Sequence, residues 1–284
     1  MKTVLIVGSS GLIGSHLVSE MPDFDFDREL YLSSRGTILP KADIIIHAAG
    51  YASPGQFMAD PIETIRVNTE LTIRLLESLN PGGTFLFCSS TEMYHGLSHP
   101  AHEDEIGTTT PSHPRSCYIE SKRCGEAIVN AYRSKGVRAI SARVALAYGP
   151  GAKKNDKRAI SQFIDSALTT GRIVLKDRGE AVRTLCYVSD TVSMLWDIAL
   201  RGQQAVYNVG GTSVVSIVEL ASMIARKTGA ELFVPDTDDN PIGAPQDVKI
   251  DLTRVREEFG MTDYVSLSDG LDRTIAWHRS LCAK

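Results

Sequence analysis

Residues 8–14 read Gly-Ser-Ser-Gly-Leu-Ile-Gly, with an apolar run before them at 4–7 and a helical pattern after them at 12–20. A strand, a glycine turn and a helix in this order are typical of dinucleotide binding, because glycines let backbone N–H groups approach a pyrophosphate at the positive end of the helix. The predicted cofactor contacts in this turn are Gly8, Ser10, Gly11, Leu12, Ile13 and Gly14.

Strand and helix patterns alternate through the first half of the chain. They predict strands at 4–7, 29–33, 43–47, 84–88 and 137–146, and helices at 12–20, 61–79 and 116–134, with a loop over 95–114. Alternation of this kind indicates a parallel sheet covered by helices on both faces. The expected fold class is therefore α/β, a Rossmann-like doubly wound parallel sheet.

The pattern loosens after residue 151. It predicts helices at 157–170, 190–200 and 216–228, strands at 172–176, 185–188 and 205–209, and a polar, proline-containing stretch at 235–247. We therefore expect a dinucleotide-binding domain over 1–150, to whose sheet 181–211 returns, and a smaller C-terminal lobe, mainly substrate-binding, over 151–284.

Small and polar residues follow the predicted strands, at the edge where ligands of parallel sheets bind. The predicted cofactor contacts along this edge are His47, Ala48, Ala49, Ser89 and Val144. We expect His47 to pack beneath the cofactor rather than to bind a metal. The second strand is followed by Ser34 and Arg35 instead of an acidic residue, and an arginine there can hold the 2′-phosphate of NADP. The expected cofactor is NAD, and NADP stays open because Arg35 is alternatively a solvated charge.

Tyr118 and Lys122 lie one helical turn apart on the helix predicted at 116–134, so both point to one face. A phenol has an unperturbed pKa of about 10, and a nearby ammonium stabilises the phenolate. The pair is therefore suited to move a proton to or from a sugar hydroxyl, with Ser90 sharing that hydroxyl. Both residues are also predicted cofactor contacts. Asn68 either orients Lys122 through water or is an ordinary amide on a helix surface.

Bulk properties narrow the classes of partner. The net charge is −4, which favours neither nucleic acid nor an anionic membrane surface. No apolar run approaches the ~20 residues of a membrane span, and the first run is too short for a signal peptide. Five scattered cysteines are typical of free thiols in the cytoplasm. The histidines and acidic residues of 95–105 are expected to be solvated, so no metal site is predicted.

Together these residues resemble the extended short-chain dehydrogenases of the NAD-dependent epimerase/dehydratase family, which modify nucleotide sugars. Residues 89–94 (Ser-Ser-Thr-Glu-Met-Tyr) and 114–123 (Pro-Arg-Ser-Cys-Tyr-Ile-Glu-Ser-Lys-Arg) look most like UDP-glucuronate decarboxylases, and the later Arg…Tyr-Val-Ser-Asp segment at 183–190 fits that group. The resemblance implies oxidation of the sugar at C4, chemistry at C5, and return of the hydride. It places Ser90, Glu92, Tyr118 and Lys122 in catalysis, and the predicted substrate contacts are Ser90, Thr91, Glu92, Arg183 and Tyr187.

Three positions depart from the family pattern. Thr91 stands where hexose 4,6-dehydratases have aspartate, so the proton donor for losing the C6 hydroxyl is missing. Leu146 replaces an asparagine that contacts the substrate, and 244–247 read Ala-Pro-Gln-Asp where the family has Arg-Pro-Gly-Asp. Two usual contacts to the nucleotide diphosphate are thus absent. Candidates to replace them are Lys153, Lys154, Lys157 and Arg183.

Three functions follow from these observations. The leading one is a redox-neutral nucleotide-sugar enzyme of decarboxylase, epimerase or dehydratase type. The second is an NADPH-dependent reductase of a nucleotide-linked keto sugar, which Arg35 favours. The third is a non-catalytic protein that senses a dinucleotide, against which the intact Ser90, Tyr118 and Lys122 set argues. The family also implies a homodimer, with the predicted helices 61–79 and 116–134 as its interface.

Overall fold

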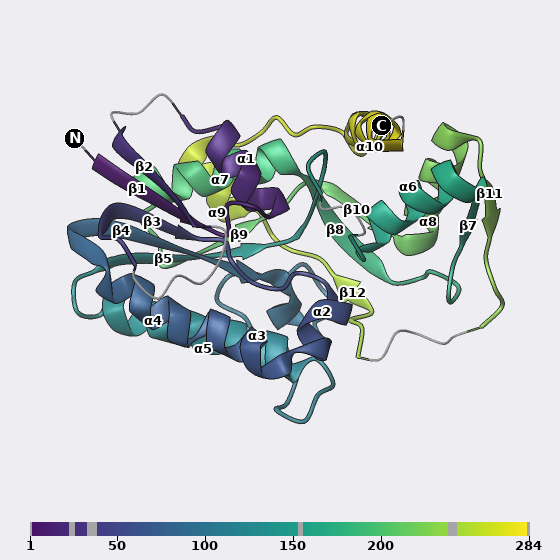
Figure 1. Cartoon of the computed structure of the whole chain (residues 1–284). Helices are drawn as coiled ribbons and strands as arrows, with labels where there is room; N and C mark the ends of the chain where they lie inside the picture. The colour runs from purple at the N-terminus through teal and green to yellow at the C-terminus, as the bar shows by residue number, and fades with distance from the viewer. Residues whose placement is uncertain (1, 23–25, 33–38, 153–155, 238–242, 283–284) are drawn as a thin grey trace.

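A six-stranded parallel sheet forms the centre of the larger of the two lobes of the molecule (Figure 1). The computed structural model describes residues 2–22, 26–32, 39–152, 156–237 and 243–282. The strand order is β2-β1-β3-β4-β5-β9, and every neighbouring pair is parallel. The strands are β1 (Lys2–Val7), β2 (Phe26–Leu32), β3 (Ala42–His47), β4 (Leu79–Ser90), β5 (Arg138–Val144) and β9 (Val206–Val209). The predicted doubly wound α/β fold is confirmed.

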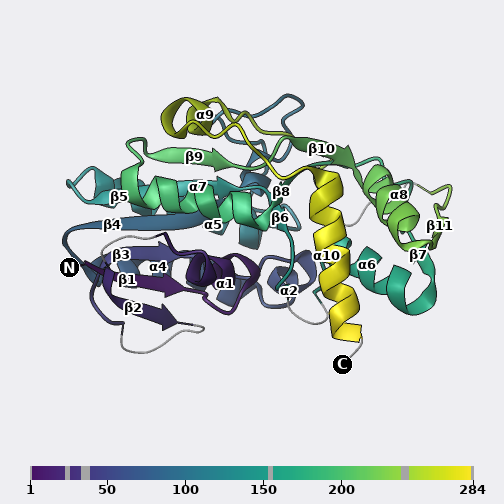
Figure 2. The same ribbon diagram turned by 90° about the horizontal axis from the view of Figure 1, so that it is seen from above.

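Helices cover both faces of this sheet, and they explain why its strands are continuously apolar (Figures 1 and 2). One face carries α3 (Pro61–Asn68), α4 (Glu70–Glu77) and α5 (Ser116–Arg133), and the other carries α1 (Leu12–Ser19) and α7 (Val188–Arg201), with α9 (Thr253–Phe259) beside β9. Along β1, Leu5 faces the first group of helices and Ile6 the second. Because successive side chains of a strand point to opposite faces, only a run that is apolar at every position suits this arrangement.

The helix predicted over 61–79 is divided into α3 and α4 at Thr69. Its φ of −118° and ψ of −69° depart from helical values. A Cβ added at Gly125 of α5 would lie 2.8 Å from the carbonyl oxygen of Asn68, so α5 packs very closely against the end of α3. The sequence also did not predict α2 (Pro54–Ala59) or the single 3₁₀ turn η1 (Thr91–Tyr94), which follows β4 directly.

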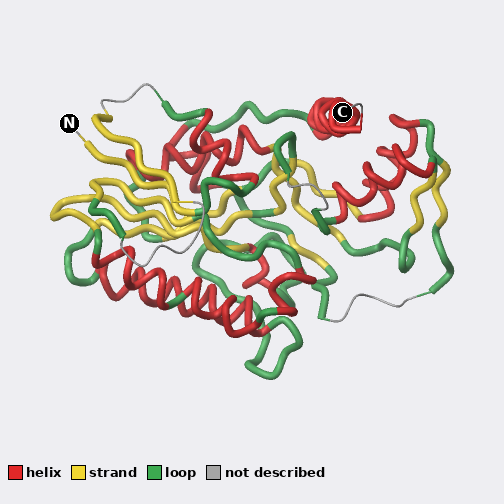
Figure 3. Tube along the Cα trace, viewed as in Figure 1, coloured by secondary structure: helices red, strands yellow, loops and turns green. Residues whose placement is uncertain are grey.

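A smaller lobe lies beyond the carboxyl ends of the strands (Figure 3). Its sheet contains β8 (Val182–Tyr187), which pairs with β10 (Ser213–Ser216), β12 (Asp247–Val248) and β6 (Leu146–Tyr148). Its other elements are α6 (Ala159–Thr170), α8 (Ile217–Thr228), α10 (Leu267–Cys282), and the pair β7 (Arg172–Val174) and β11 (Glu231–Phe233). Of the segment 181–211, which was predicted to return to the main sheet, β9 does so, whereas β8 lies in this second sheet.

The loop predicted over 95–114 is held against the main sheet by a buried arginine. Arg143 of β5 forms an ion pair with Glu126 of α5, with 2.8 Å between Nη2 and Oε2, and donates from Nη1 to the carbonyls of Glu103 and Glu105. His99 pairs with Glu105 rather than with other possible metal ligands. Within the described ranges, no three His, Cys, Asp or Glu side chains gather as a metal ion would require, and no helix is long and apolar enough to cross a bilayer.

Candidate active site

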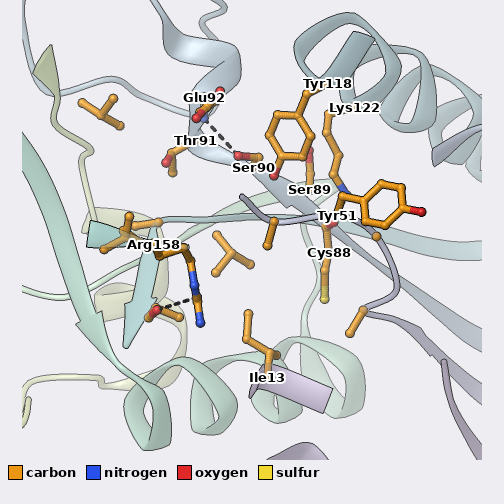
Figure 4. A pocket seen from close by; sticks show the side chains of 18 of the residues that line it. Ile13, Tyr51, Cys88, Ser89, Ser90, Thr91, Glu92, Tyr118, Lys122 and Arg158 are labelled. Atoms are coloured by element: carbon orange, nitrogen blue, oxygen red, sulfur yellow. Dashed lines mark hydrogen bonds between the residues drawn. The ribbon is translucent and has the colours of Figure 1, made fainter. Parts of the chain in front are cut away.

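A pocket opens at the carboxyl ends of β3, β4 and β5, between the parallel sheet and the smaller lobe (Figure 4). The sheet side contributes Ile13, the segment 48–52, the segment 88–92, Tyr118, Lys122 and Val144–Ala147, and the lobe contributes Arg158, Arg183, Thr184, Pro245 and Val248. Because each strand of a parallel sheet ends at the same edge, residues from distant parts of the sequence meet here.

The glycine turn above β1 is built so tightly that side chains would not fit. Gly8 has a φ of +91°, and a Cβ there would lie 2.7 Å from the carbonyl of Ala48. A Cβ at Gly14 would lie 2.1 Å from the carbonyl oxygen of Gly8, which also accepts a 2.9 Å hydrogen bond from the N–H of Gly11. Gly11 is the N-cap of α1, so the turn leads straight into a helix N-terminus, which attracts anions.

Polar atoms in and behind the pocket also suit a bound dinucleotide. Among the described residues, Ser89 Oγ, Asn68 Oδ1 and His47 Nδ1 are buried without a hydrogen-bond partner. Buried polar atoms are nearly always satisfied, so such atoms point to partners that a ligand or water supplies. The residues present therefore fit the predicted dinucleotide. Ser34 and Arg35, the predicted determinants between NAD and NADP, lie outside the described residues.

His47 and Asn68 support the site from behind. His47 is fully buried, its Nε2 lies 3.0 Å from the carbonyl oxygen of Val67, and burial lowers the pKa of the imidazole to about 3. It is thus neutral and packed against Phe87, as expected for a residue beneath the cofactor. Asn68 is only 2% exposed and donates to Ser121 Oγ over 2.9 Å, so the alternative of an exposed surface amide is wrong.

Tyr118 and Lys122 project from α5 into the pocket, where the hydroxyl end of Tyr118 points toward Ser90 (Figure 4). The Tyr118 ring stacks on Phe57 with 4.6 Å between centroids. Lys122 Nζ donates to the carbonyl oxygen of Cys88 over 2.8 Å. The predicted proton-transfer set therefore lies together at one end of the pocket.

The electrostatics of this pair differ from the sequence-based expectation. Burial raises the pKa of Tyr118, with a further contribution from the negative charge of Glu92, while the neighbouring hydroxyl group of Ser90 lowers it. Burial also lowers the pKa of Lys122 to about 8. Lys122 was expected to lower the pKa of the phenol, but this effect does not dominate. The ammonium group of Lys122 is directed to the carbonyl oxygen of Cys88, and an enclosed phenolate is costly to desolvate.

Glu92 lies in η1, one turn beyond the end of β4. Its backbone N–H donates to Ser90 Oγ over 3.1 Å, and its Oε1 accepts from Arg115 Nη1 over 3.0 Å. Within the described structure its other oxygen, Oε2, is enclosed and has no hydrogen-bond partner. Burial raises the pKa of Glu92, and the positive charges of Arg115 and Arg183 oppose this rise. One carboxylate oxygen is thus held by the protein and the other is left for a ligand.

Two further arginines line the pocket from the lobe. Arg183 of β8 donates to the carbonyls of Val182 and Pro245 over 2.7 and 2.8 Å, so its guanidinium is fixed beside the pocket. Arg158, the N-cap of α6, donates to the carbonyl of Ala147 over 3.1 Å and pairs with the carboxylate of Asp156. The sequence predicted Arg183 but missed Arg158.

Of the remaining predicted substrate residues, one lines the pocket and one does not. Thr91 lines the pocket, whereas Tyr187 does not and instead packs edge-on against Tyr148, with 5.6 Å between ring centroids, inside the lobe core. Leu146 and Pro245, at the departures from the family pattern, both line the pocket wall. Lys153 and Lys154 lie outside the described residues.

Comparisons with known proteins agree with this geometry. A model described as the NAD dependent epimerase/dehydratase family matches residues 33–210. UDP-glucuronic acid decarboxylase 1 of Xenopus tropicalis is 31% identical over 308 residues, covering 98% of this chain and 72% of that protein. The solved structure of MoeE5 in complex with UDP-glucuronic acid and NAD is similar with a TM-score of 0.83 and 26% identity, over 98% of this chain and 99% of that one. RMD from Pseudomonas aeruginosa, complexed with NADPH, is similar with a TM-score of 0.82 and 25% identity, over 99% and 100% of the two chains.

Proposed function

The chain belongs to the NAD-dependent epimerase/dehydratase family, and we propose that it decarboxylates a nucleotide-linked glucuronic acid through a transient 4-keto sugar, without net oxidation or reduction. A relative of known activity is named as a UDP-glucuronic acid decarboxylase, and a structural neighbour at 26% identity holds UDP-glucuronic acid with NAD. Both point to a uronic acid as the sugar.

The observation that carries the proposal is the pairing of an acid/base set with cations across one pocket. Tyr118 and Ser90 lie on the sheet side, and Arg158 and Arg183 lie on the lobe side. A nucleotide-linked uronic acid has two anionic parts, the diphosphate and the sugar carboxylate. Fixed guanidinium groups are well suited to both, because their planar donors match carboxylate and phosphate oxygens.

The residues on the sheet side handle the hydroxyl group at C4. When bound, NAD supplies the hydride acceptor for C4 and the hydride donor for the final reduction. As the phenolate, which the positive charges of oxidised NAD and of Lys122 would favour, Tyr118 accepts the hydroxyl proton while C4 is oxidised, and as the phenol it gives the proton back when C4 is reduced. Ser90 lines the same end of the pocket, so its hydroxyl holds the C4 oxygen beside the phenol. Lys122, at 4.7 Å from the centroid of the Phe87 ring and bound to Cys88, supplies positive charge beside this oxygen.

The residues on the other side act at C5. Once C4 is a ketone, the C5 carboxylate leaves as carbon dioxide, and its electron pair moves into an enolate whose oxygen is stabilised by Ser90 and Tyr118. Protonation of C5 and return of the hydride to C4 complete the sequence. Glu92 Oε2, which is buried and has no hydrogen-bond partner among the described residues, accepts a hydrogen bond from a sugar hydroxyl near C5, and Arg183 holds the departing carboxylate or a phosphate.

Incubation with UDP-glucuronic acid in deuterated water tests the proposal. We expect carbon dioxide release, a UDP-pentose that carries one deuterium at C5, and turnover without added cofactor, because the hydride is returned in each cycle. Mass spectrometry of the product and of a panel of other nucleotide sugars provides the measurement. Stoichiometric consumption of NADPH, or deuterium at C5 without loss of carbon dioxide, would contradict a redox-neutral decarboxylase.

We further propose a homodimer through the lower helices of Figure 1. Ile62, Ile65 and Ile73 of α3 and α4 are 60%, 40% and 37% exposed, and Ala127 and Ala131 lie on the exposed side of α5. Exposed apolar side chains gathered on neighbouring helices are typical of an interface between subunits.

Ile65→Glu is therefore expected to convert the dimer to a monomer, because each subunit would bury an unpaired carboxylate in the interface. Sedimentation velocity at micromolar concentration provides the measurement. Val174→Glu is the matched control, since Val174 is 62% exposed but lies in β7 of the smaller lobe rather than on α3, α4 or α5. A wild-type protein that sediments as a monomer would remove the proposal.

A further inference from the structure

Arg115 connects the two segments that carry the predicted catalytic residues. Its side chain is only 6% exposed, and its Nη1 lies 3.0 Å from Glu92 Oε1 in η1. Its carbonyl oxygen accepts hydrogen bonds from the N–H groups of Tyr118 and Ile119 over 3.0 and 3.1 Å, because Arg115 is the N-cap of α5. One residue therefore fixes Glu92 relative to the first turn of the helix that carries Tyr118.

The backbone of Arg115 is itself held in place. Its N–H donates to His113 Nδ1 over 3.2 Å, and the His113 ring packs edge-on against His95 with 4.7 Å between centroids. A side chain that is buried, paired and attached to a fixed backbone has few alternative rotamers. Its guanidinium thus reaches Glu92 with little conformational freedom left to lose, which is the condition for accurate placement of a functional group.

We propose that Arg115 is a positioning residue for the proposed reaction: it holds Glu92 by Oε1 and so presents Oε2 to the sugar as an ionised hydrogen-bond acceptor. The proposal rests on the proposed function for its substrate. Its structural basis, one carboxylate oxygen bound to a buried guanidinium and the other enclosed without a partner among the described residues, does not depend on which sugar binds.

The charges around Glu92 explain why a dedicated cation is needed. The titratable and charged groups that act on it or respond to it are Arg115, Cys117 and Tyr118 of α5 and its cap, His113 of the preceding loop, and Arg183 of β8. Burial raises the pKa of Glu92, and an anionic sugar would raise it further through like-charge repulsion. Arg183 donates to the carbonyls of Val182 and Pro245, so Arg115 provides the direct contact that opposes this rise and favours the ionised carboxylate.

The pH dependence of kcat/KM for UDP-glucuronic acid tests the proposal, because a merely structural role of Arg115 would not shift it. If Glu92 must be ionised, activity falls as the pH decreases through the pKa of Glu92. Loss of Arg115 raises that pKa, so the acidic limb moves to higher pH. For Arg115→Gln we expect a shift of about 1–3 pH units, the range typical of removing one close cation, and Arg115→Lys is expected to restore part of it.

The same substitution in a Glu92→Gln background is the matched control. With no carboxylate at 92, Arg115→Gln should leave the acidic limb where Glu92→Gln alone places it, which isolates the pairwise effect. An acidic limb that coincides in wild type and Arg115→Gln would overturn the proposal. So would a shift that persists in the Glu92→Gln background.

A second readout needs no turnover. Infrared titration of the purified enzyme follows the stretching band of a protonated carboxylic acid, and Glu92→Gln identifies which part of the band belongs to Glu92. We expect this band to appear at higher pH in Arg115→Gln than in wild type, and an unchanged midpoint would refute the role of Arg115. If UDP-glucuronic acid is not a substrate, the proposed function fails while this titration still decides about Arg115. Circular dichroism checks that each variant is folded.

Discussion

Tyr118→Phe is expected to reduce kcat/KM for UDP-glucuronic acid by about 10²–10⁴-fold, the usual contribution of a positioned proton donor and acceptor. The substitution removes one hydroxyl group, the one that points toward Ser90, and keeps the ring that stacks on Phe57. Because Tyr118 is almost fully buried, water cannot readily take the place of the lost group. Steady-state kinetics with mass-spectrometric product detection provide the measurement.

Tyr132→Phe is the matched control for this experiment. Tyr132 lies at the other end of α5 and packs against the core on the α5 side of the sheet, so it loses the same atom from the same helix without changing the pocket. We expect its activity to stay within a factor of two or so of wild type, as is usual for substitutions away from a site. Cofactor content and melting temperature should be unchanged in both variants. Wild-type turnover by Tyr118→Phe would leave the chain as a dinucleotide-binding protein without this proton-transfer role.

The strands of the parallel sheet were predictable because their sequence patterns are local. Residues 4–7 and 44–46 are apolar at every position, and β1 and β3 are indeed buried on both faces between the two groups of helices. A glycine turn leading into α1 is likewise encoded in one short segment. The pairing itself joins distant segments, such as Val4 with Ile44, and it was inferred from the alternation of strands and helices.

The lobe was less predictable because its strands are short and pair with distant segments. β12 has two residues, Asp247 and Val248, and becomes a strand by pairing with Val182 and Arg183 of β8. A two-residue strand has no hydrophobic period of its own. At the break at Thr69, likewise, the close approach of Gly125 comes from another helix.

The candidate site shows the same division. Tyr118, Lys122 and Ser90 were predictable from spacing, and the structure brings them together. Arg115 was not predicted to have a role, although it lies in the segment 114–123 that resembles the family. The role of an arginine depends on the carboxylate that it contacts, and this contact is not visible in the sequence. Tyr187 was predicted for the opposite reason: it belongs to a recognisable segment, but its side chain turns into the lobe core.

Gly8→Ala is expected to abolish cofactor retention and to destabilise the protein by more than the cost of its positive φ alone. Gly8 has a φ of +91°, which alone costs a residue with a side chain about 1–3 kcal/mol. A Cβ there would also lie 2.7 Å from the backbone carbonyl carbon of Ala48 and the N of Ala49, which are not flexible. The end of β3 must therefore move away from the turn. Since that movement displaces the backbone N–H groups that receive the pyrophosphate, binding and stability fall together.

Gly136→Ala separates the backbone cost from the steric one. Gly136 has a φ of +88°, nearly the same as Gly8, but a Cβ there would have no atom within 4 Å. It should lose only the about 1–3 kcal/mol of the positive φ and keep its NAD. Urea unfolding gives the free energy of unfolding of each variant, and the nucleotide released on denaturation gives its cofactor content. Equal destabilisation of the two variants, with NAD retained by Gly8→Ala, would mean that the turn has room for a side chain. The close approach of the turn to the end of β3 would then not explain why residue 8 is glycine.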